Sequence, residues 1–335
     1  MTIGSATHMS EGFPSHEPDR LEQSVALARR LRSAIGSVIQ GKTQAIDTAL
    51  AVYLAGGHLL LQDVPGVGKT TLAKAIARAV DCPVRRIQFT PDLMPSDITG
   101  VNIYDQRRGV FEFRHGAIFA SVVVADEINR ASPKTQSAVL EAMEENQVTV
   151  DGVTYPLPAT FFVIATQNPL EMEGTYPLPE AQRDRFMARI SMGYPDPATE
   201  LAMLEAHAAD SPLEKLAPVA TEPEVEAATE VTRQLHASAA LKRYVVDLVA
   251  ATRTDAQLRL GASPRASLHL LRAARGHALV AGRSHVLPQD VQAMAAPVLA
   301  HRVLLSGQAR MENRTTSDVI ASILAHVPIT EAATG

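Results

Sequence analysis

The 335-residue chain contains no tryptophan, a single cysteine and few aromatic residues, which make up 4% of it. The lone Cys82 excludes an internal disulfide and is typical of proteins from a reducing cytoplasm. No apolar run approaches the roughly 18 residues that a membrane-spanning helix needs. Residues 1–20 also lack the basic-then-apolar pattern of a secretion signal. These absences predict a cytoplasmic protein without membrane insertion.

An excess of positive charge is missing as well. Lysine and arginine together number 31 against 36 aspartates and glutamates, which gives a net charge of −5. This balance argues against a protein that grips nucleic acid mainly by electrostatics. The eleven histidines show no close metal-ligand spacing, so we interpret them as core or solvated residues. The hydrophobic share of 46% is ordinary for a globular protein, and the length suggests about two domains.

The most informative stretch is an apolar run that ends in a glycine-containing turn and leads directly into a helical pattern. The run is Leu59–Gln62, and Leu72, Ile76 and Val80 recur four residues apart after it. A strand, turn and helix in this order form a phosphate-binding loop, because backbone amides and the helix N-terminus attract anions. The predicted loop consists of Asp63, Val64, Pro65, Gly66, Val67, Gly68, Lys69, Thr70 and Thr71.

The residue types in this loop suit ATP and Mg²⁺. Gly66 and Gly68 let the backbone approach the phosphates, Lys69 reaches the β- and γ-phosphates, and the Thr70 hydroxyl faces the metal. The strict pattern would have a glycine where this chain has Asp63, whose carboxylate suits a phosphate site only if it points away. The alternative that remains open is an ordinary turn with a chance Gly-Val-Gly-Lys-Thr sequence.

Polar side chains also end two later apolar runs. Asp126 and Glu127 follow the first run, and we expect Asp126 to hold Mg²⁺ and Glu127 to polarise the attacking water. The alternative is an acidic pair exposed at a strand exit. Asn168 follows the second run and is either a γ-phosphate sensor or a turn residue before Pro169.

Strand and helix patterns alternate over residues 21–194, which predicts a three-layer α/β core with a parallel sheet. We expect a disordered tail over residues 1–20 and hairpins near 101–113 and 148–155. Over residues 195–335 the alanine-rich helical periodicity predicts an all-helical second domain. Its expected helices cover 199–208, 224–237, 241–254, 264–281 and 288–300.

Several longer strings resemble one family of proteins. They are PDLMPSDITG at 91–100, ADEINRA at 125–131, ATQNP at 165–169, EGTYPLPEAQ at 173–182 and DRF at 184–186. Together with the phosphate loop they are similar to the MoxR family of AAA+ ATPases, over roughly residues 36–305. The resemblance implies ATP hydrolysis on a P-loop core that is followed by a helical lid.

The resemblance also implies roles that the residues alone do not give. Arg185 aligns with the arginine finger that acts on ATP bound to a neighbouring subunit. Arg265 aligns with a lid arginine that contacts the γ-phosphate of its own subunit. Without the resemblance both would be read as ordinary arginines of a surface and a helix start. Ile39 and Gly41 would lie against the adenine, and an acidic residue such as Asp63 is common at its position in the family.

At the level of the assembly, the resemblance implies a ring, most simply a hexamer, that remodels client proteins as a chaperone. It also implies a partner with a von Willebrand factor A domain. Two other functions stay open from the sequence: a nucleic-acid motor of the same superfamily, and a nucleotide-gated scaffold with little turnover.

Overall fold

The computed structural model describes residues 17–64, 66–168, 175–195, 197, 200–201 and 212–329. Residues 1–16 of the predicted tail and most of the predicted helix at 199–208 lie outside the described residues. Helix α1 (Glu17–Val38) begins inside the stretch that we expected to be disordered. The start fits the local sequence, because Pro18 suits a first helical turn and the acidic residues Glu17 and Asp19 suit a helix N-terminus.

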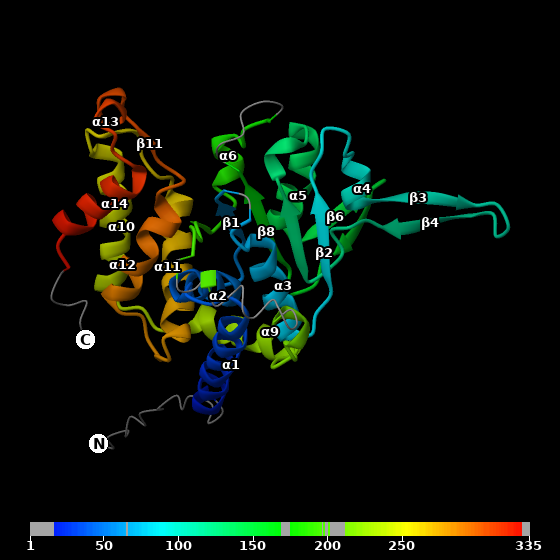
Figure 1. Ribbon diagram of the computed structural model, residues 1–335, viewed down its shortest axis with the longest axis horizontal. Helices are drawn as coiled ribbons and strands as arrows, with labels where there is room; N and C mark the ends of the chain where they lie inside the picture. Colours follow the sequence, from blue (N-terminus) through cyan, green and yellow to red (C-terminus); the bar gives the residue numbers. More distant parts are fainter. Residues whose placement is uncertain are drawn as a thin grey trace, which may run out of the picture.

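The core is built on one five-stranded parallel sheet in the order β2-β5-β8-β1-β9 (Figure 1). The predicted parallel sheet is therefore confirmed. Strand β9 was not predicted, because three residues are too few to show a pattern. The strands are β1 (Leu59–Gln62), β2 (Val84–Gln88), β5 (Val122–Asp126), β8 (Phe162–Gln167) and β9 (Ala188–Ile190).

Alternate residues of the strands belong to two apolar clusters, one on each face of the sheet. Leu59 and Leu61 pack with helices α1, α2 and α3, whereas Leu60 packs with α5 on the opposite face. This alternation produces the predicted three layers. The core helices are α2 (Thr43–Leu54), α3 (Lys69–Val80), α4 (Pro95–Thr99), α5 (Pro133–Glu145) and α6 (Glu180–Arg183), with a 3₁₀ turn at Ile128–Arg130.

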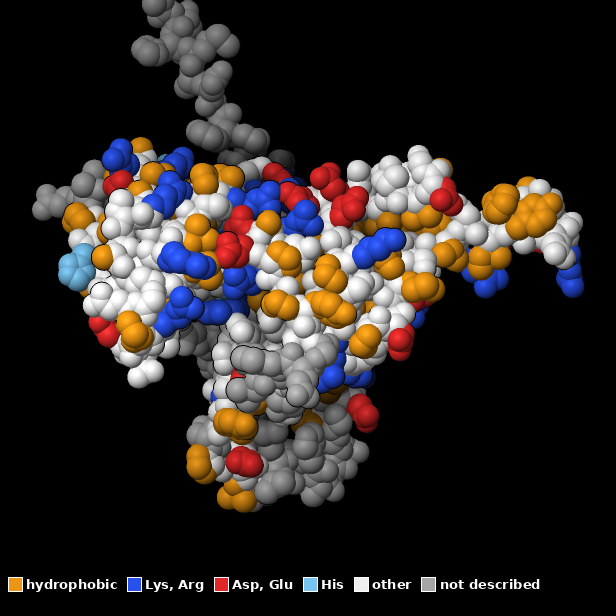
Figure 2. Space-filling model, turned by 90° about the horizontal axis from the view of Figure 1, so that it is seen from above, with side chains coloured by type: hydrophobic (Ala, Val, Ile, Leu, Met, Phe, Trp, Pro, Cys, Tyr) orange, Lys and Arg blue, Asp and Glu red, His pale blue; other side chains and the backbone are white. Residues whose placement is uncertain are grey.

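Both predicted hairpins are present. One consists of β3 (Gly100–Asp105) and β4 (Val110–His115), the other of β6 (Gln147–Val150) and β7 (Val153–Pro156). The β3–β4 hairpin projects from the body, and hydrophobic side chains gather near its end (Figure 2). Phe111 is the most exposed of them, at 71%. At the base, the Phe113 ring stacks on Tyr155 with 4.0 Å between centroids, which joins the two hairpins.

The lid is mainly helical, as predicted, and four of the expected helices are confirmed. It also contains a short antiparallel pair, β10 (Leu258–Leu260) and β11 (Leu304–Leu305), which no sequence pattern indicated. The helices in the predicted lid range are α8 (Pro212–Lys215), α9 (Glu222–Gln234), α10 (Ala239–Thr254), α11 (Pro264–Val280), α12 (Pro288–Leu299), α13 (Gly307–Met311) and α14 (Thr316–His326). Of these, α8 and α9 pack on the core helices α3 and α1.

The lid and the core share one apolar cluster. Helix α11 of the lid packs on α2 of the core, and the two backbones come so close that a Cβ at Gly276 would lie 2.0 Å from the carbonyl oxygen of Ala51. Only glycine allows this approach. Within the described ranges, no helix is both long enough and apolar enough to cross a membrane.

Candidate functional site

The carboxyl ends of neighbouring strands bring the predicted site residues together. β1 leads into the phosphate loop, β5 ends at Asp126, and β8 leads to the buried Asn168. Because β5, β8 and β1 are adjacent and parallel, these ends meet along one edge of the sheet. Ligands of open parallel sheets bind at this edge.

The phosphate loop has the backbone that its glycines predict. Gly66 and Gly68 have φ angles of 84° and 90°, a conformation that strains any residue with a side chain. Helix α3 begins immediately afterwards at Lys69, so Thr70 lies in its first turn. The backbone N–H groups of that turn have no intrahelical partners and are available to an anion.

Lys69 lies over its own loop. Its Nζ donates hydrogen bonds to the carbonyl oxygens of Asp63, at 2.6 Å, and Val64, at 3.1 Å. The ammonium group is therefore held at the loop. Pro65, part of the predicted phosphate-binding set, lies outside the described residues.

The Asp63 carboxylate points away from the phosphate side of the loop, as a phosphate site at this position requires. Its Oδ2 accepts hydrogen bonds from the Ser191 hydroxyl at 2.8 Å and from the N–H groups of Met192 and Gly193 at 2.7 Å each. Its Oδ1 accepts from the N–H of Val64 at 2.9 Å. Burial by itself would raise the pKa of this carboxyl, but the donated hydrogen bonds outweigh it and lower the pKa below its usual value. The carboxylate thus ties the loop to the segment that follows β9.

The carboxylates of Asp126 and Glu127 are positioned by side chains that the sequence did not single out. Asp126 accepts a 2.5 Å hydrogen bond from the Thr166 hydroxyl, and Arg86 donates to its other oxygen at 2.6 and 2.9 Å. The Glu127 N–H donates to the same Thr166 oxygen, and Gln88 donates to the Glu127 carboxylate at 3.1 Å. The only signal in the sequence was the alternation of Arg86 and Gln88 along one strand, which becomes informative once β2 is known to pair with β5.

A pocket of about 590 Å³ lies beside the phosphate loop. Gly41, predicted to contact the adenine, lines it, and the adjacent Ile39 is buried. Met192, which binds Asp63 through its N–H, also lines the pocket. Two residues of the lid helix α12, Ala296 and Pro297, form part of its wall. The pocket therefore lies between the end of β1, the segment that follows β9 and the lid helix α12.

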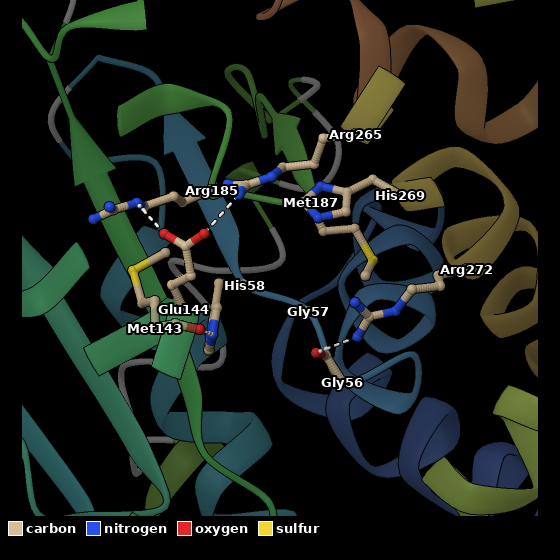
Figure 3. A pocket seen from close by; sticks show the side chains of 10 residues that line it. All are labelled: Gly56, Gly57, His58, Met143, Glu144, Arg185, Met187, Arg265, His269 and Arg272. Atoms are coloured by element: carbon tan, nitrogen blue, oxygen red, sulfur yellow. Dashed lines mark hydrogen bonds and ion pairs between the residues drawn. The ribbon is translucent and has the colours of Figure 1, made fainter. Parts of the chain in front are cut away.

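Arg185 and Arg265 meet in a second pocket, of about 190 Å³ (Figure 3). Arg185 comes from the segment before β9, and Arg265 from the first turn of the lid helix α11. Both guanidinium groups pair with the same carboxylate, Glu144: Arg185 Nε lies 3.0 Å from one oxygen and Arg265 Nη2 lies 2.6 Å from the other. We call Arg185 and Arg265 the interface arginines.

The second pocket lies at the opposite end of the sheet from the phosphate loop. Gly57 and His58, which line it, come directly before β1, and Met187 comes directly before β9. The phosphate loop follows the carboxyl end of β1. This separation does not support the predicted contact between Arg265 and the γ-phosphate of its own subunit, because the whole length of β1 lies between them.

Comparisons with known proteins identify the family of the chain. A family model described as "ATPase family associated with various cellular activities (AAA)" matches residues 58–188, and an "AAA lid domain" model matches residues 250–323. Over 330 residues the chain is 42% identical to Chaperone MoxR1 of Mycobacterium tuberculosis, which covers 94% of this chain and 87% of that relative. The chain belongs to the MoxR family of AAA+ ATPases. 

Two further relatives extend the match. This MoxR-family chain is 46% identical to the uncharacterized protein YeaC of Bacillus subtilis, over 88% of this chain and 92% of the relative. A crystal structure from Cytophaga hutchinsonii, described provisionally as an ATPase, superposes with a TM-score of 0.87 at 38% identity. That match covers 95% of this chain and all of the other. The fold predicted from the MoxR resemblance is thereby confirmed.

The site residues fit the nucleotide and metal that the family implies. The glycine backbone of the loop leaves room at Gly66, where an added Cβ would meet nothing within 4 Å. Lys69 offers an ammonium group, and the Thr70 hydroxyl and Asp126 carboxylate are oxygen donors of the kind that Mg²⁺ prefers. 

Proposed function

We propose that this MoxR-family protein hydrolyses ATP at sites shared between neighbouring subunits of a ring, most simply a hexamer. The observation that carries the proposal is the separation of the two halves of the site. The phosphate loop lies at the carboxyl edge of the sheet, whereas the interface arginines lie at the amino edge. One chain therefore supplies arginines that its own phosphate loop cannot use, and a neighbouring chain can use them.

Within one subunit, the carboxyl-edge residues take the nucleotide and the water. Lys69 and the first turn of α3 bind the phosphates, and Thr70 with Asp126 hold Mg²⁺, which neutralises phosphate charge when bound. Glu127 orients and polarises the attacking water, and Thr166 fixes both acidic residues through one hydroxyl. Asn168 contacts the γ-phosphate or the water.

Across the interface, Arg185 and Arg265 act together on the ATP of the neighbour. Arg185 and Arg265 share the Glu144 carboxylate, and Arg265 Nε also lies 4.0 Å from the Asp184 carboxylate, which Arg302 binds. Three guanidinium groups thus face two carboxylates, so the arginine pair keeps an excess positive charge. Such a pair is suited to the negative charge that develops on a transferred phosphoryl group. In this proposal Arg265 acts in trans, next to Arg185, and not in its own subunit.

Hydrolysis would move the lid against the core and remodel a bound client protein. The chaperone name of the M. tuberculosis relative supports this part of the proposal. The MoxR resemblance supports a partner with a von Willebrand factor A domain.

The proposal is tested by measuring phosphate release as a function of protein concentration. We compare the wild type with Glu127→Gln and Arg185→Ala. The specific rate should rise with concentration in the wild type and collapse in both variants, since each site needs two subunits. A rate that does not depend on concentration and survives Arg185→Ala would mean that each subunit works alone.

A further inference from the structure

Asp184, the residue before Arg185, belongs to the core, but both of its carboxylate oxygens are bound by the lid. Oδ1 accepts from Arg302 Nε at 2.7 Å, just beyond the end of α12. Oδ2 accepts from the hydroxyl of Ser263, the N-cap of α11, at 3.1 Å and lies 4.0 Å from Nε of Arg265. Neither bond is needed to complete the phosphate site, yet together they attach the arginine-bearing segment to two lid helices.

Arg302 holds more than the carboxylate. Its side chain is 2% exposed, and it donates to the carbonyl oxygens of Asp184 at 3.0 Å, Phe186 at 2.6 Å and Met187 at 3.1 Å. We call residues 184–187 the finger segment. A buried arginine that binds three carbonyls and one carboxylate of a four-residue segment fixes that segment rigidly.

His269 completes the enclosure from α11. Its Nδ1 accepts a 2.5 Å hydrogen bond from Arg302, so the ring must be neutral at that nitrogen. His269 also lines the pocket of the interface arginines, one turn along α11 from Arg265. The finger segment, Arg265 and Arg302 are thus parts of one connected unit that belongs mostly to the lid.

Helix α12 connects this unit to the nucleotide pocket of the same subunit. Ala296, Pro297 and Ala300 line the 590 Å³ pocket beside the phosphate loop, and Arg302 follows two residues after Ala300. A nucleotide bound against α12 therefore contacts the end of the helix that leads to Arg302, and Arg302 holds the finger segment.

We propose that Asp184 and Arg302 are positioning residues that couple the nucleotide pocket of one subunit to the interface arginines that it offers to the next. Lid closure over a bound nucleotide moves α12, and the Asp184–Arg302 pair carries the finger segment with it. A subunit with ATP bound then presents Arg185 correctly, and an empty subunit presents it poorly. This inference rests on the proposed action of Arg185 in trans.

The test uses mixed rings in which one variant donates its arginines to another. Arg185→Ala subunits keep an intact phosphate loop and Glu127, so they report on the arginines of their neighbours. Two donors are compared: Glu127→Gln, which retains Lys69 for ATP binding, and Lys69→Ala, which lacks it. ATP binding is measured directly for each donor, and mass photometry confirms that mixed rings form. The coupling predicts at least a fivefold higher phosphate release with the Glu127→Gln donor.

The positioning role is then tested by adding Asp184→Asn with Arg302→Gln to the Glu127→Gln donor. This double change removes both charges together, so that neither partner leaves an unpaired charge. Phosphate release by the mixed rings, which we call rescue, should fall to the level seen with the Lys69→Ala donor. The ATP affinity of the donor should change less than threefold.

A matched control lies at the other end of α12. Asp290 is fully buried and pairs with Arg283 and His277, all within the lid. Asp290→Asn with Arg283→Gln should lower the melting temperature of the donor but leave its rescue unchanged. A merely structural role for the Asp184–Arg302 pair would make the two double variants behave alike.

The outcomes distinguish a failure of the coupling from a failure of the shared active site. Equal rescue by both donors, or full rescue by the Asp184→Asn/Arg302→Gln donor, would overturn the coupling and leave the shared site intact. Full activity of Arg185→Ala without any donor would overturn the shared site itself.

Discussion

At the scale of single residues, Asp63 determines how the phosphate loop is held. The change to test is Asp63→Gly, which restores the strict G-x-x-x-x-G-K-T pattern. We expect it to weaken ATP affinity at least about tenfold, because it removes four hydrogen bonds to a charged acceptor, each contributing about 1.5–3 kcal/mol. Equilibrium binding of a fluorescent ATP analogue measures the effect.

The same substitution at Asp81 provides the control. Asp81 caps the far end of α3 with a φ of 52°, where glycine is preferred, so Asp81→Gly should leave ATP affinity unchanged. If Asp63→Gly bound ATP as tightly as the wild type, the hydrogen bonds between the loop and the segment after β9 would not contribute to ATP affinity.

Residue types in the phosphate loop were predictable, but their partners were not. The sequence indicated that the Asp63 carboxylate must point away, yet its partners at 191–193 lie about 130 residues later in the chain. Likewise, Arg86 and Thr166 reach Asp126 only because β2 and β8 flank β5 in the sheet. The order of strands is a tertiary property, and local pattern does not contain it.

At the scale of elements, the crossing of α2 and α11 depends on one glycine. Gly276→Ala places a methyl group against the Ala51 carbonyl, so the helices must separate. Overpacking of this kind costs about 1–3 kcal/mol. We expect a lower free energy of unfolding by that amount, measured by urea denaturation.

Gly36 in α1 is the matched site, since an added Cβ there would meet nothing within 4 Å. Gly36→Ala should raise the free energy of unfolding by roughly 0.5–1 kcal/mol, because alanine leaves the unfolded chain less conformational freedom than glycine does. Equal effects of the two substitutions would contradict the close packing of the lid on the core.

Long elements were predicted well and short ones were not. Helix α11 spans Pro264–Val280 against a predicted range of 264–281, because an apolar stripe marks it. Strands β9 and β11 have three and two residues, too few for a period to show. Helix α14 was not predicted, although Thr315 and Asp318 form a capping box at its start.

At the scale of the whole molecule, buried histidines should make stability depend on pH. Burial lowers the pKa of His58 to about 4 and that of His269 to about 2, and it lowers the pKa of His301 as well. These histidines stay neutral in the folded protein but take up protons in the unfolded chain, whose histidine pKa is about 6.5. The free energy of unfolding is therefore highest above about pH 6.5 and falls as the pH drops below it. Each histidine can contribute a slope of about 1.4 kcal/mol per pH unit in that window.

Urea denaturation between about pH 7 and about pH 5 measures this dependence. His58→Gln should reduce the slope of unfolding free energy against pH by about 1.4 kcal/mol per pH unit, the effect of one proton. His285→Gln, at an exposed position, should leave the slope unchanged. The account of the buried histidines would be wrong if the two variants had equal slopes.

The central claim, that one active site is built from two subunits, is tested most directly by mixing two inactive variants. Glu127→Gln lacks the water-polarising carboxylate, and Arg185→Ala lacks the arginine offered to the neighbour. A random ring of equal parts contains sites with both groups intact, so phosphate release should recover to about a quarter of the wild-type rate per subunit. If mixed rings form and release no more phosphate than the separate variants, the shared site is contradicted.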